Sequence, residues 1–299
     1  MAALSSASDA DGVLARAAAG VLRSPKATVA AVACVLLLVT AIIGPSLVPQ
    51  DPYDLNVLDI MDAKLPPGGE GMDGTVFRLG TDGQGRDMLS AMVYGLRTSL
   101  FVGVLAGVVA LVVGTVLGLV AAFAGGRIDS VIMRIVDLML GLPTLLVALM
   151  LLALLGQGVW KVVLALVLVQ WAMFARAVRG AALVEKNKDY VEAARATPLP
   201  GHRVVVRHLL PNCLPPLIVV GTVQVANAIS LEATLSFLGL GLPPTEPSLG
   251  MLIANGFQYM MSGRTWISVY PGIALIVLIV AINIVGDQLR DQFNPRLRR

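Results

Sequence analysis

Three charged side chains within apolar stretches are the residues of this 299-residue sequence that could do chemistry. Glu232 lies inside the apolar run 214–238, and Arg134 and Asp137 lie three residues apart near the start of the run 130–156. A charge inside a membrane is costly unless it is paired or faces water, so such residues often serve ion or proton pathways. A proton-coupling role for Glu232 and an ion pathway at Arg134 and Asp137 are therefore open.

Structural roles are the alternatives for the same residues. Glu232 could make a structural hydrogen bond or a polar contact near the outer mouth of a pathway. Arg134 and Asp137 share one helix face and could form an ion pair at the membrane interface, with Arg134 reaching toward water.

The sequence contains no motif for catalysis, nucleotide binding or a metal. It has no Gly-Lys dipeptide, which excludes a phosphate-binding loop of the Walker type, and neither Gly-x-Ser-x-Gly nor His-Glu-x-x-His occurs. Both histidines, His202 and His208, lie in one charged segment, and the cysteines Cys34 and Cys213 have neither metal-ligand spacing nor an expected disulfide. We therefore expect no catalytic residue and no metal site.

A charged, helix-prone segment, 185–212, separates two apolar runs in the second half of the chain. Residues 188–196 predict a short polar helix, and Pro198, Pro200 and Gly201 follow it. Such a helix, held outside a bilayer and hinged by proline and glycine, suits the transfer of force from a soluble partner. The alternative is an ordinary solvated basic loop.

The composition indicates an integral membrane protein. Hydrophobic residues make up 57% of the chain and charged residues 14%, and the mean hydropathy is +0.81, whereas soluble domains are about 25% charged. A bilayer core of about 30 Å requires about 20 helical residues. Apolar runs of about this length predict an all-α protein with six transmembrane helices at 27–48, 99–124, 130–156, 159–175, 214–238 and 266–285.

Prolines affect the interpretation of two of these apolar runs. Pro45 and Pro49 follow the first run where a signal peptide would have small residues for cleavage, so we expect an uncleaved span. Pro143 is expected to kink the third span.

The distribution of Lys and Arg predicts the orientation. If the N-terminus is cytoplasmic, most of the 22 Lys and Arg residues lie on the cytoplasmic side, which agrees with the positive-inside bias. An even number of spans then places both termini in the cytoplasm. The expected division is a cytoplasmic tail 1–26, a first transmembrane helix 27–48, an extracytoplasmic loop 49–98, a core 99–285 of five transmembrane helices with a cytoplasmic coupling loop 176–213, and a cytoplasmic tail 286–299.

Two patterns describe the surroundings of the second span. Residues 85–100 have apolar side chains at helical spacing, which predicts an amphipathic helix lying at the outer interface. Gly103, Gly107, Gly114 and Gly118 form two pairs four residues apart, a spacing that lets helix backbones approach closely; the alternative is simply a glycine-rich span.

Four segments resemble one family. Glu192-Ala193-Ala194, with Leu210-Pro211-Asn212 beyond it, resembles the EAA loop of binding-protein-dependent ABC importer permeases. The segments 79–90 (with Gly-Thr-Asp and Gly-Arg-Asp) and 233–244 (with Ser-Phe-Leu-Gly-Leu-Gly) resemble signatures of the C-type permease subunit of dipeptide and oligopeptide importers. The tail 286–296 is similar to the ending of that family.

The resemblance implies a five-helix permease core preceded by one extra helix. It implies ATPase coupling by Asp189, Tyr190, Glu192, Ala193, Ala194, Arg195 and Gly201. Ala193 and Ala194 would allow close approach to the ATPase, while Glu192 and Arg195 would pair with its charges. The extracytoplasmic signature comprises Gly80, Thr81, Asp82, Gly85, Arg86 and Asp87.

The resemblance also implies a transport subunit of a bacterial inner (plasma) membrane that is not catalytic alone. Its partners would be a second, homologous permease subunit in a heterodimer, two ATPase subunits or one fused ATPase, an extracytoplasmic solute-binding protein and membrane lipid, but no nucleic acid. ATP and Mg would be used by the ATPase subunits, with no cofactor bound by this chain.

The implied function is half of a translocation pathway for di- and oligopeptides. The alternative cargo is nickel, haem or another solute. A self-contained ion-coupled carrier, with Glu232 or Asp137 as the proton site, and a membrane scaffold without transport activity are alternatives from other classes.

One position departs from the family pattern. Pro198 stands where the family has a glycine, and Pro200 and Gly201 follow. Proline fixes φ near −65° and disfavours the helical conformation of the residue before it. We therefore expect the short helix to end at or before Ala196 and the turn to be reshaped or moved to Gly201.

Overall fold

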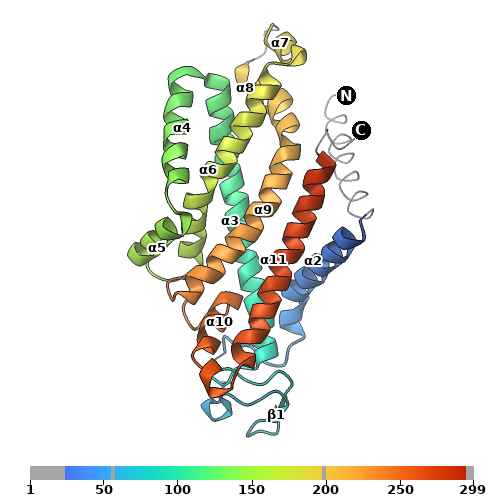
Figure 1. Ribbon diagram of the computed structural model, residues 1–299, viewed down its shortest axis with the longest axis vertical. Coiled ribbons are helices and arrows are strands. Elements are labelled where there is room, and N and C mark those ends of the chain that lie inside the picture. The colour runs from blue at the N-terminus through green and yellow to red at the C-terminus, as the bar shows by residue number, and fades with distance from the viewer. Residues whose placement is uncertain (1–23, 55–57, 197–199, 294–299) are drawn as a thin grey trace.

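The computed structural model describes residues 24–54, 58–196 and 200–293, most of which are helical. Long helices run side by side along the molecule, with α7 at one end and a small loop region at the other (Figure 1). The α-helices are α2 (Pro25–Ile43), α3 (Met88–Ala124), α4 (Gly126–Gly141), α5 (Thr144–Leu155), α6 (Val159–Lys186), α7 (Asp189–Ala196), α8 (Gly201–Val204), α9 (Leu210–Phe237), α10 (Leu249–Phe257) and α11 (Trp266–Phe293).

Short elements complete the described chain. The 3₁₀ turns are Gly44–Ser46, Ile60–Asp62 and Met260–Ser262, and a π-helical turn, Val205–Leu209, joins α8 to α9. Strands β1 (Gly69–Glu70) and β2 (Val76–Phe77) pair antiparallel, with Gly69 opposite Phe77. This hairpin belongs to the loop region at the end opposite α7 (Figure 1).

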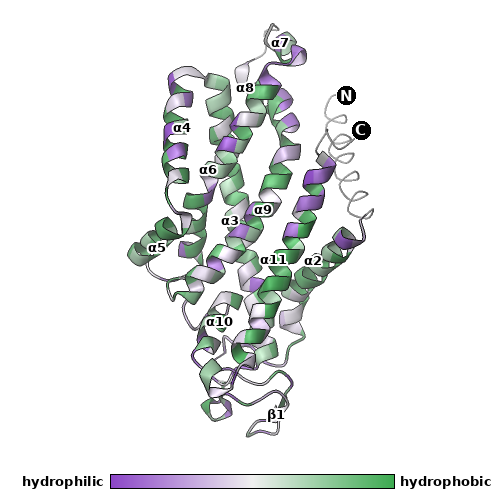
Figure 2. Cartoon of the chain, in the orientation of Figure 1, coloured by the Kyte–Doolittle hydropathy of each residue, from purple (hydrophilic) through white to green (hydrophobic). Residues whose placement is uncertain are grey.

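The described residues contain five helices long and apolar enough to cross a membrane, or six spans if the bent pair α4 and α5 counts as one. The five are Pro25–Ser46, Met88–Ala124, Val159–Lys186, Gly201–Phe237 and Trp266–Gln292. A mostly helical membrane protein with several spans is therefore confirmed. Residues of α2 and α5 are mostly hydrophobic, whereas hydrophilic residues occur in α7 and toward the C-terminal end of α11 (Figure 2).

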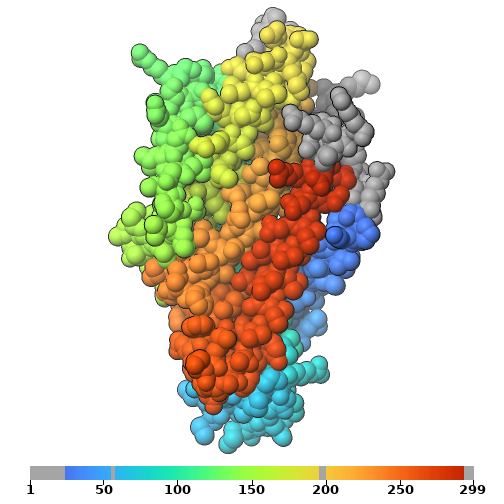
Figure 3. Space-filling model, in the orientation of Figure 1, coloured from blue at the N-terminus to red at the C-terminus, as the bar shows by residue number. Residues whose placement is uncertain are grey.

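The run 130–156 is not one kinked helix, and that prediction was wrong. It forms α4 and α5, which meet at 92°. Leu142 has φ −92° and ψ 143°, the extended conformation that a following proline favours, and Pro143 then precedes the first residue of α5. Proline therefore ends one helix and starts another. The two helices project from one side of the molecule (Figure 3).

The separate interfacial helix predicted for 85–100 is also wrong. Residues 88–100 are the first turns of α3, which runs for 37 residues without a break. Met88, Val93 and Leu96 are buried by the protein itself. Val93 packs beside Gly44, and Gly95 lies against the start of α10. The apolar face that suggested contact with lipid headgroups is therefore covered by neighbouring elements.

The glycine pairs of α3 form the predicted packing face. A Cβ on Gly103 would lie 2.3 Å from Ile229 of α9, and one on Gly107 would lie 3.0 Å from Val225. About two turns farther along α3, a Cβ on Gly114 or Gly118 would lie 2.5 or 2.6 Å from a backbone carbonyl oxygen of α6. Each pair thus brings α3 against a different helix, and α3 forms the centre of the bundle.

α6 continues as a helix well beyond the predicted end of its span at residue 175. It reaches Lys186, so the first residues of the predicted coupling loop 176–213 are part of α6. Arg176 and Arg179 lie in this extension and pair with α4, which accounts for charges in a continuous helix.

Candidate functional site

The short helix α7 presents two different faces. Val191 is fully buried and Ala194 is 8% exposed, whereas Asp189, Glu192 and Ala193 are exposed. The helix stands at the tip of the molecule (Figure 1). A separate protein that docks here would meet the exposed face.

Ala194 therefore does not lie on the exposed face, although the sequence analysis predicted that it would approach an ATPase closely. Its side chain belongs to a buried cluster with Leu119 of α3, Val178 of α6 and Cys213 of α9, rather than to the exposed face. The cluster joins α7 to three long helices. Of the two alanines, only Ala193 is exposed and could make the expected close approach to an ATPase. Ala194 packs against other helices of its own chain.

The end of α6 holds α7 through Glu185. Its carboxylate accepts hydrogen bonds from the Tyr190 hydroxyl at 2.7 Å and from Lys188 Nζ at 2.6 Å. Burial, then the hydrogen bond to Glu185, raises the pKa of Tyr190 to about 12, so the phenol stays protonated and remains a donor at physiological pH. Tyr190 thus anchors α7 as well as lying beside the exposed face.

Two further contacts attach this end to α3. Lys186 Nζ donates to the carbonyl oxygens of Ala122 at 2.8 Å and Phe123 at 3.3 Å, which satisfies acceptors at the C-terminal end of α3. A Cβ on Gly201 would lie 2.9 Å from the Phe123 ring, so the start of α8 also sits closely on α3. The side chain of Arg195 and the turn at Pro198 lie outside the described residues.

The predicted Arg134–Asp137 pair is replaced by pairs between helices. Asp137 bonds to Arg176 of α6, and Arg134 is exposed on α4. Asp129 makes a two-pronged pair with Arg179, with Nε–Oδ1 at 2.5 Å and Nη2–Oδ2 at 2.6 Å. Local spacing could not reveal these partners, because they lie about 40 or 50 residues apart in the chain and meet only when α4 packs on α6.

Glu232 is fully buried and links three helices. Its carboxylate accepts hydrogen bonds from Ser99 of α3 at 2.9 Å and from Ser236 of α9 at 2.8 Å. Ser99 Oγ in turn accepts from the backbone N–H of Leu249, at the start of α10, at 3.3 Å. This geometry favours the structural interpretation of Glu232 over the proton-coupling one.

The signature residues Gly80 to Asp87 belong to a buried polar cluster. Asp82 accepts a bond from Arg86 Nε at 2.7 Å, and both side chains are 1% exposed. Arg86 Nη1 donates to the carbonyl oxygen of Pro244 at 3.2 Å, and Trp266 Nε1 donates to that of Thr81 at 3.3 Å. The two signature segments, far apart in sequence, therefore contact each other.

Two glycines and the N-cap residue of α3 shape the same cluster. Gly80 and Gly85 have φ of 77° and 80°, and a Cβ on Gly85 would lie 2.1 Å from the carbonyl oxygen of Asp59. Asp87 caps α3 by accepting from Ser90 N at 2.8 Å and Ser90 Oγ at 2.6 Å. Gly85 thus shapes the loop region itself, whereas Asp87 caps α3 and Thr81 contacts Trp266 of α11.

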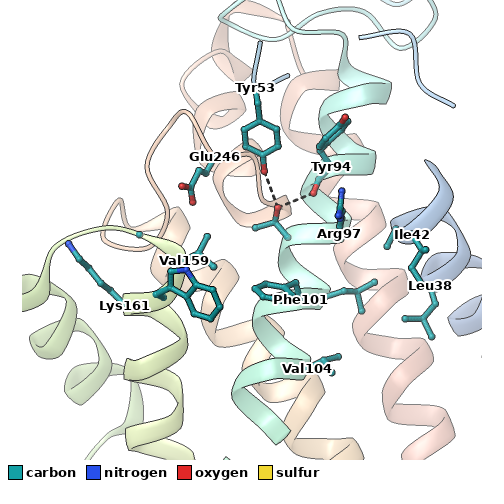
Figure 4. Close-up of a pocket in the computed structure, with 15 residues that line it drawn as sticks. Leu38, Ile42, Tyr53, Tyr94, Arg97, Phe101, Val104, Val159, Lys161 and Glu246 are labelled. Atoms are coloured by element: carbon teal, nitrogen blue, oxygen red, sulfur yellow. Dashed lines mark hydrogen bonds between the residues drawn. The ribbon is translucent and has the colours of Figure 1, made fainter. Parts of the chain in front are cut away.

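A pocket of about 830 Å³ opens beside this region, between α2, α3 and the start of α6. Figure 4 shows Tyr53, Tyr94 and Arg97 on one side and Glu246 and Lys161 on the other, above Phe101 and Val104. The Tyr53 and Tyr94 rings lie 5.5 Å apart, and Phe101 packs edge-on against Trp160 at 5.9 Å. A charged rim over an apolar floor suits an amphipathic molecule. Sequence reasoning missed this pocket because its residues come from separate segments.

Comparison with known proteins identifies the family. A family model described as "Binding-protein-dependent transport system inner membrane component" matches residues 114–299. The chain belongs to this family. Dipeptide transport system permease protein DppC of Escherichia coli (strain K12) is 40% identical over 278 residues, 93% of this chain and 91% of that protein. The protein of the same name from Bacillus subtilis (strain 168) is 37% identical over 263 residues, 88% and 79% of the two chains.

The fold has a counterpart among solved structures. An inward-facing structure of the MetNI methionine ABC transporter matches with a TM-score of 0.57 at 20% identity, over 69% of this chain and 97% of that chain. This likeness concerns the fold. Family membership and the identity to the two dipeptide permeases confirm the resemblance drawn from the sequence motifs. As a membrane transport component of this family, the chain is not an enzyme by itself.

Proposed function

We propose that this chain is a permease subunit of an ATP-driven importer and forms half of a translocation pathway for di- and oligopeptides. The observation that carries the proposal is the 40% identity to the E. coli dipeptide permease over 93% of this chain. The membrane would be the bacterial inner membrane, crossed six times, with both termini and α7 in the cytoplasm. A second permease subunit, ATPase subunits and an extracytoplasmic binding protein would complete the importer.

Coupling follows from the two faces of α7. The exposed face, with Asp189, Glu192 and Ala193, would dock on an ATPase. The buried face, with Val191 and Ala194, joins the cluster shared by α3, α6 and α9. A movement of the docked helix would therefore reach several spans together, because close-packed interiors transmit displacement.

We propose a flexible point in the connection between α7 and α9. The π-helical turn Val205–Leu209 departs from α-helical hydrogen bonding, and Pro211, two residues after it, has no backbone N–H to donate. Pro215 and Pro216 remove two further donors within α9. We propose that α9 changes its tilt here when α7 moves.

ATP-driven uptake by the assembled complex tests the function. The permease pair, ATPase and binding protein are reconstituted in liposomes, and uptake of a radiolabelled dipeptide is measured with and without ATP. We expect ATP-dependent uptake and none by this chain alone under a pH gradient. Uptake of nickel or haem in place of peptide would reassign the cargo, and pH-driven uptake by the chain alone would favour the ion-coupled carrier.

A charge reversal tests the docking face. Glu192→Lys reverses a charge on an exposed side chain, so we expect the protein to fold normally but to lose ATP-driven uptake and to bind the ATPase about tenfold more weakly or worse. Arg134→Glu, on the exposed surface of α4 away from α7, is the control and should retain uptake. Normal uptake by Glu192→Lys would exclude this face as the docking site.

A further inference from the structure

A groove between α5, α6 and α9 carries polar side chains within the membrane-spanning part of the bundle. It has a volume of about 470 Å³, within the usual range for ligand pockets of roughly 300–1,000 Å³. Figure 1 shows α5, α6 and α9 converging on one side of the molecule, away from α2 and α11. The groove is separate from the outer pocket between α2, α3 and α6.

One wall of the groove is a polar stripe of α9. We use this name for Gln224, Asn227, Ser230 and Thr234. At 100° per residue these positions fall within about 120° of one another, and they extend about 15 Å along the outer half of the helix. Asn227 and Ser230 are exposed in this chain. Polar groups in a membrane face water or a polar partner rather than lipid, so this face of α9 is not a lipid surface.

Gln170 supplies the opposite wall. This α6 side chain is only 4% exposed, and its Oε1 atom has no hydrogen-bond partner among the described residues. A buried acceptor without a partner is costly, by about 1–3 kcal/mol in typical proteins, and is rare unless something else binds it. Because Gln170 lines the groove, a rotation of its amide would offer this acceptor to a donor from a molecule there.

The chemistry of the lining is neutral throughout. Amides come from Gln170, Gln224 and Asn227, and hydroxyls come from Thr144, Ser230 and Thr234. Asn227 Nδ2 donates to Gln224 Oε1 at 2.7 Å, which leaves the Asn227 oxygen and the Gln224 nitrogen for other partners. None of the described lining residues is acidic or basic, and Leu140, Leu145 and Met173 fill the space between the polar groups.

We propose that this groove is the cargo-facing wall of the translocation pathway in this subunit, and that it binds the main-chain amides of peptides. The identification of the cargo rests on the proposed function. Each peptide bond offers one donor and one acceptor, which match neutral amides and hydroxyls. A charged wall would hold oppositely charged cargo tightly, whereas conduction requires binding that is weak enough for release. The groove therefore accepts peptides whatever the charge of their side chains.

Thiol labelling tests the groove without assuming a cargo. Ser230→Cys is placed in a complex in which Cys34 and Cys213 are changed to alanine, and a charged, membrane-impermeant thiol reagent is applied to the reconstituted complex. Thr222→Cys is the matched control, because Thr222 lies on another face of α9 with neighbours from α2 and α11. We expect labelling at Ser230→Cys to be about tenfold faster than at Thr222→Cys. Equal rates would overturn the proposal, because the groove would then not hold water.

Substitutions on both walls test peptide binding. In the double variant Gln170→Met and Asn227→Leu, we expect uptake of acidic, basic and neutral dipeptides to fall by the same factor, about tenfold. Thr222→Val removes a hydroxyl from the other face of α9 and should keep normal uptake. Uptake within twofold of the parent would contradict the proposal. So would loss of the second permease from the purified complex, since the polar stripe would then be a subunit contact.

The two tests separate failure of this inference from failure of the proposed function. If the parent complex imports no peptide, the peptide assignment fails. The labelling of Ser230→Cys still decides whether the groove belongs to a water-filled pathway. If the parent imports peptides but Ser230→Cys resists the reagent, the groove assignment fails alone.

Discussion

Ala193 and Ala194 are adjacent and chemically identical, yet they face opposite environments. Ala193 is exposed, and Ala194 is buried against α3, α6 and α9. We expect Ala194→Trp to destabilise the protein by about 1–3 kcal/mol, because a large side chain overpacks the cluster. Ala193→Trp should leave stability nearly unchanged and weaken ATPase binding.

Thermal unfolding of the purified chain and ATPase pull-down are the measurements for this pair. The reverse pattern, with Ala193→Trp unfolding at the lower temperature, would show that α7 is rotated relative to the arrangement described above. Full ATPase binding by Ala193→Trp, with unchanged stability, would exclude this face from docking.

Glu232 gives a second prediction at the scale of single residues. Glu232→Leu leaves the hydroxyls of Ser99 and Ser236 buried without their acceptor, so we expect a loss of stability of about 1–3 kcal/mol. Glu232→Gln keeps one acceptor oxygen and should lose less. Denaturant unfolding measures both. A stable Glu232→Gln variant that also imports peptide normally would support the structural role, whereas a stable variant without uptake would restore a proton-coupling role.

At the scale of elements, the glycines of α3 determine how closely the central helices pack. A Cβ on Gly114 would lie 2.5 Å from Phe174 Cβ and from the carbonyl oxygen of Trp171. We therefore expect Gly114→Ala to push α6 away and to cost about 1–3 kcal/mol of stability. Differential scanning fluorimetry of the purified complex provides the measurement.

Gly180 on α6 is the matched control, since a Cβ there meets no atom within 4 Å. Gly180→Ala should be neutral or should stabilise the protein by about 0.4–1 kcal/mol, because alanine lowers the entropy of the unfolded chain. Equal destabilisation by both substitutions would mean that glycine is needed for backbone conformation rather than for the α3–α6 contact.

At the scale of the whole molecule, the two ends serve different sides of the membrane in the proposed topology. α7 lies at one end and the β1–β2 hairpin at the other (Figure 1). In intact cells, with Cys34 and Cys213 replaced by alanine, we expect an impermeant thiol reagent to label Met72→Cys but not Ala193→Cys. Both positions are exposed, so both should react after permeabilisation. Labelling of Ala193→Cys in intact cells would invert the topology.

The sequence by itself determined the class of protein, most of the spans and the family. Long apolar runs are local, and a bilayer demands helices of a given length, so 27–48 and 266–285 could be recognised without any partner. The same holds for the short helix 188–196, close to α7, and for the glycine spacing of α3. Each of these signals depends on neighbours within one or two helical turns.

Only the tertiary structure decided which residues meet. Asp137 had a partner three residues away by spacing, but its actual partner is Arg176, because α4 packs on α6. Pro143 was expected to bend a helix, and it separates two helices that meet at 92°. In the same way, the sequence did not show that Ala194 is buried or that the polar stripe of α9 lines a groove. A helical pattern shows which residues share a face, but the packing of other helices decides whether that face is buried or open.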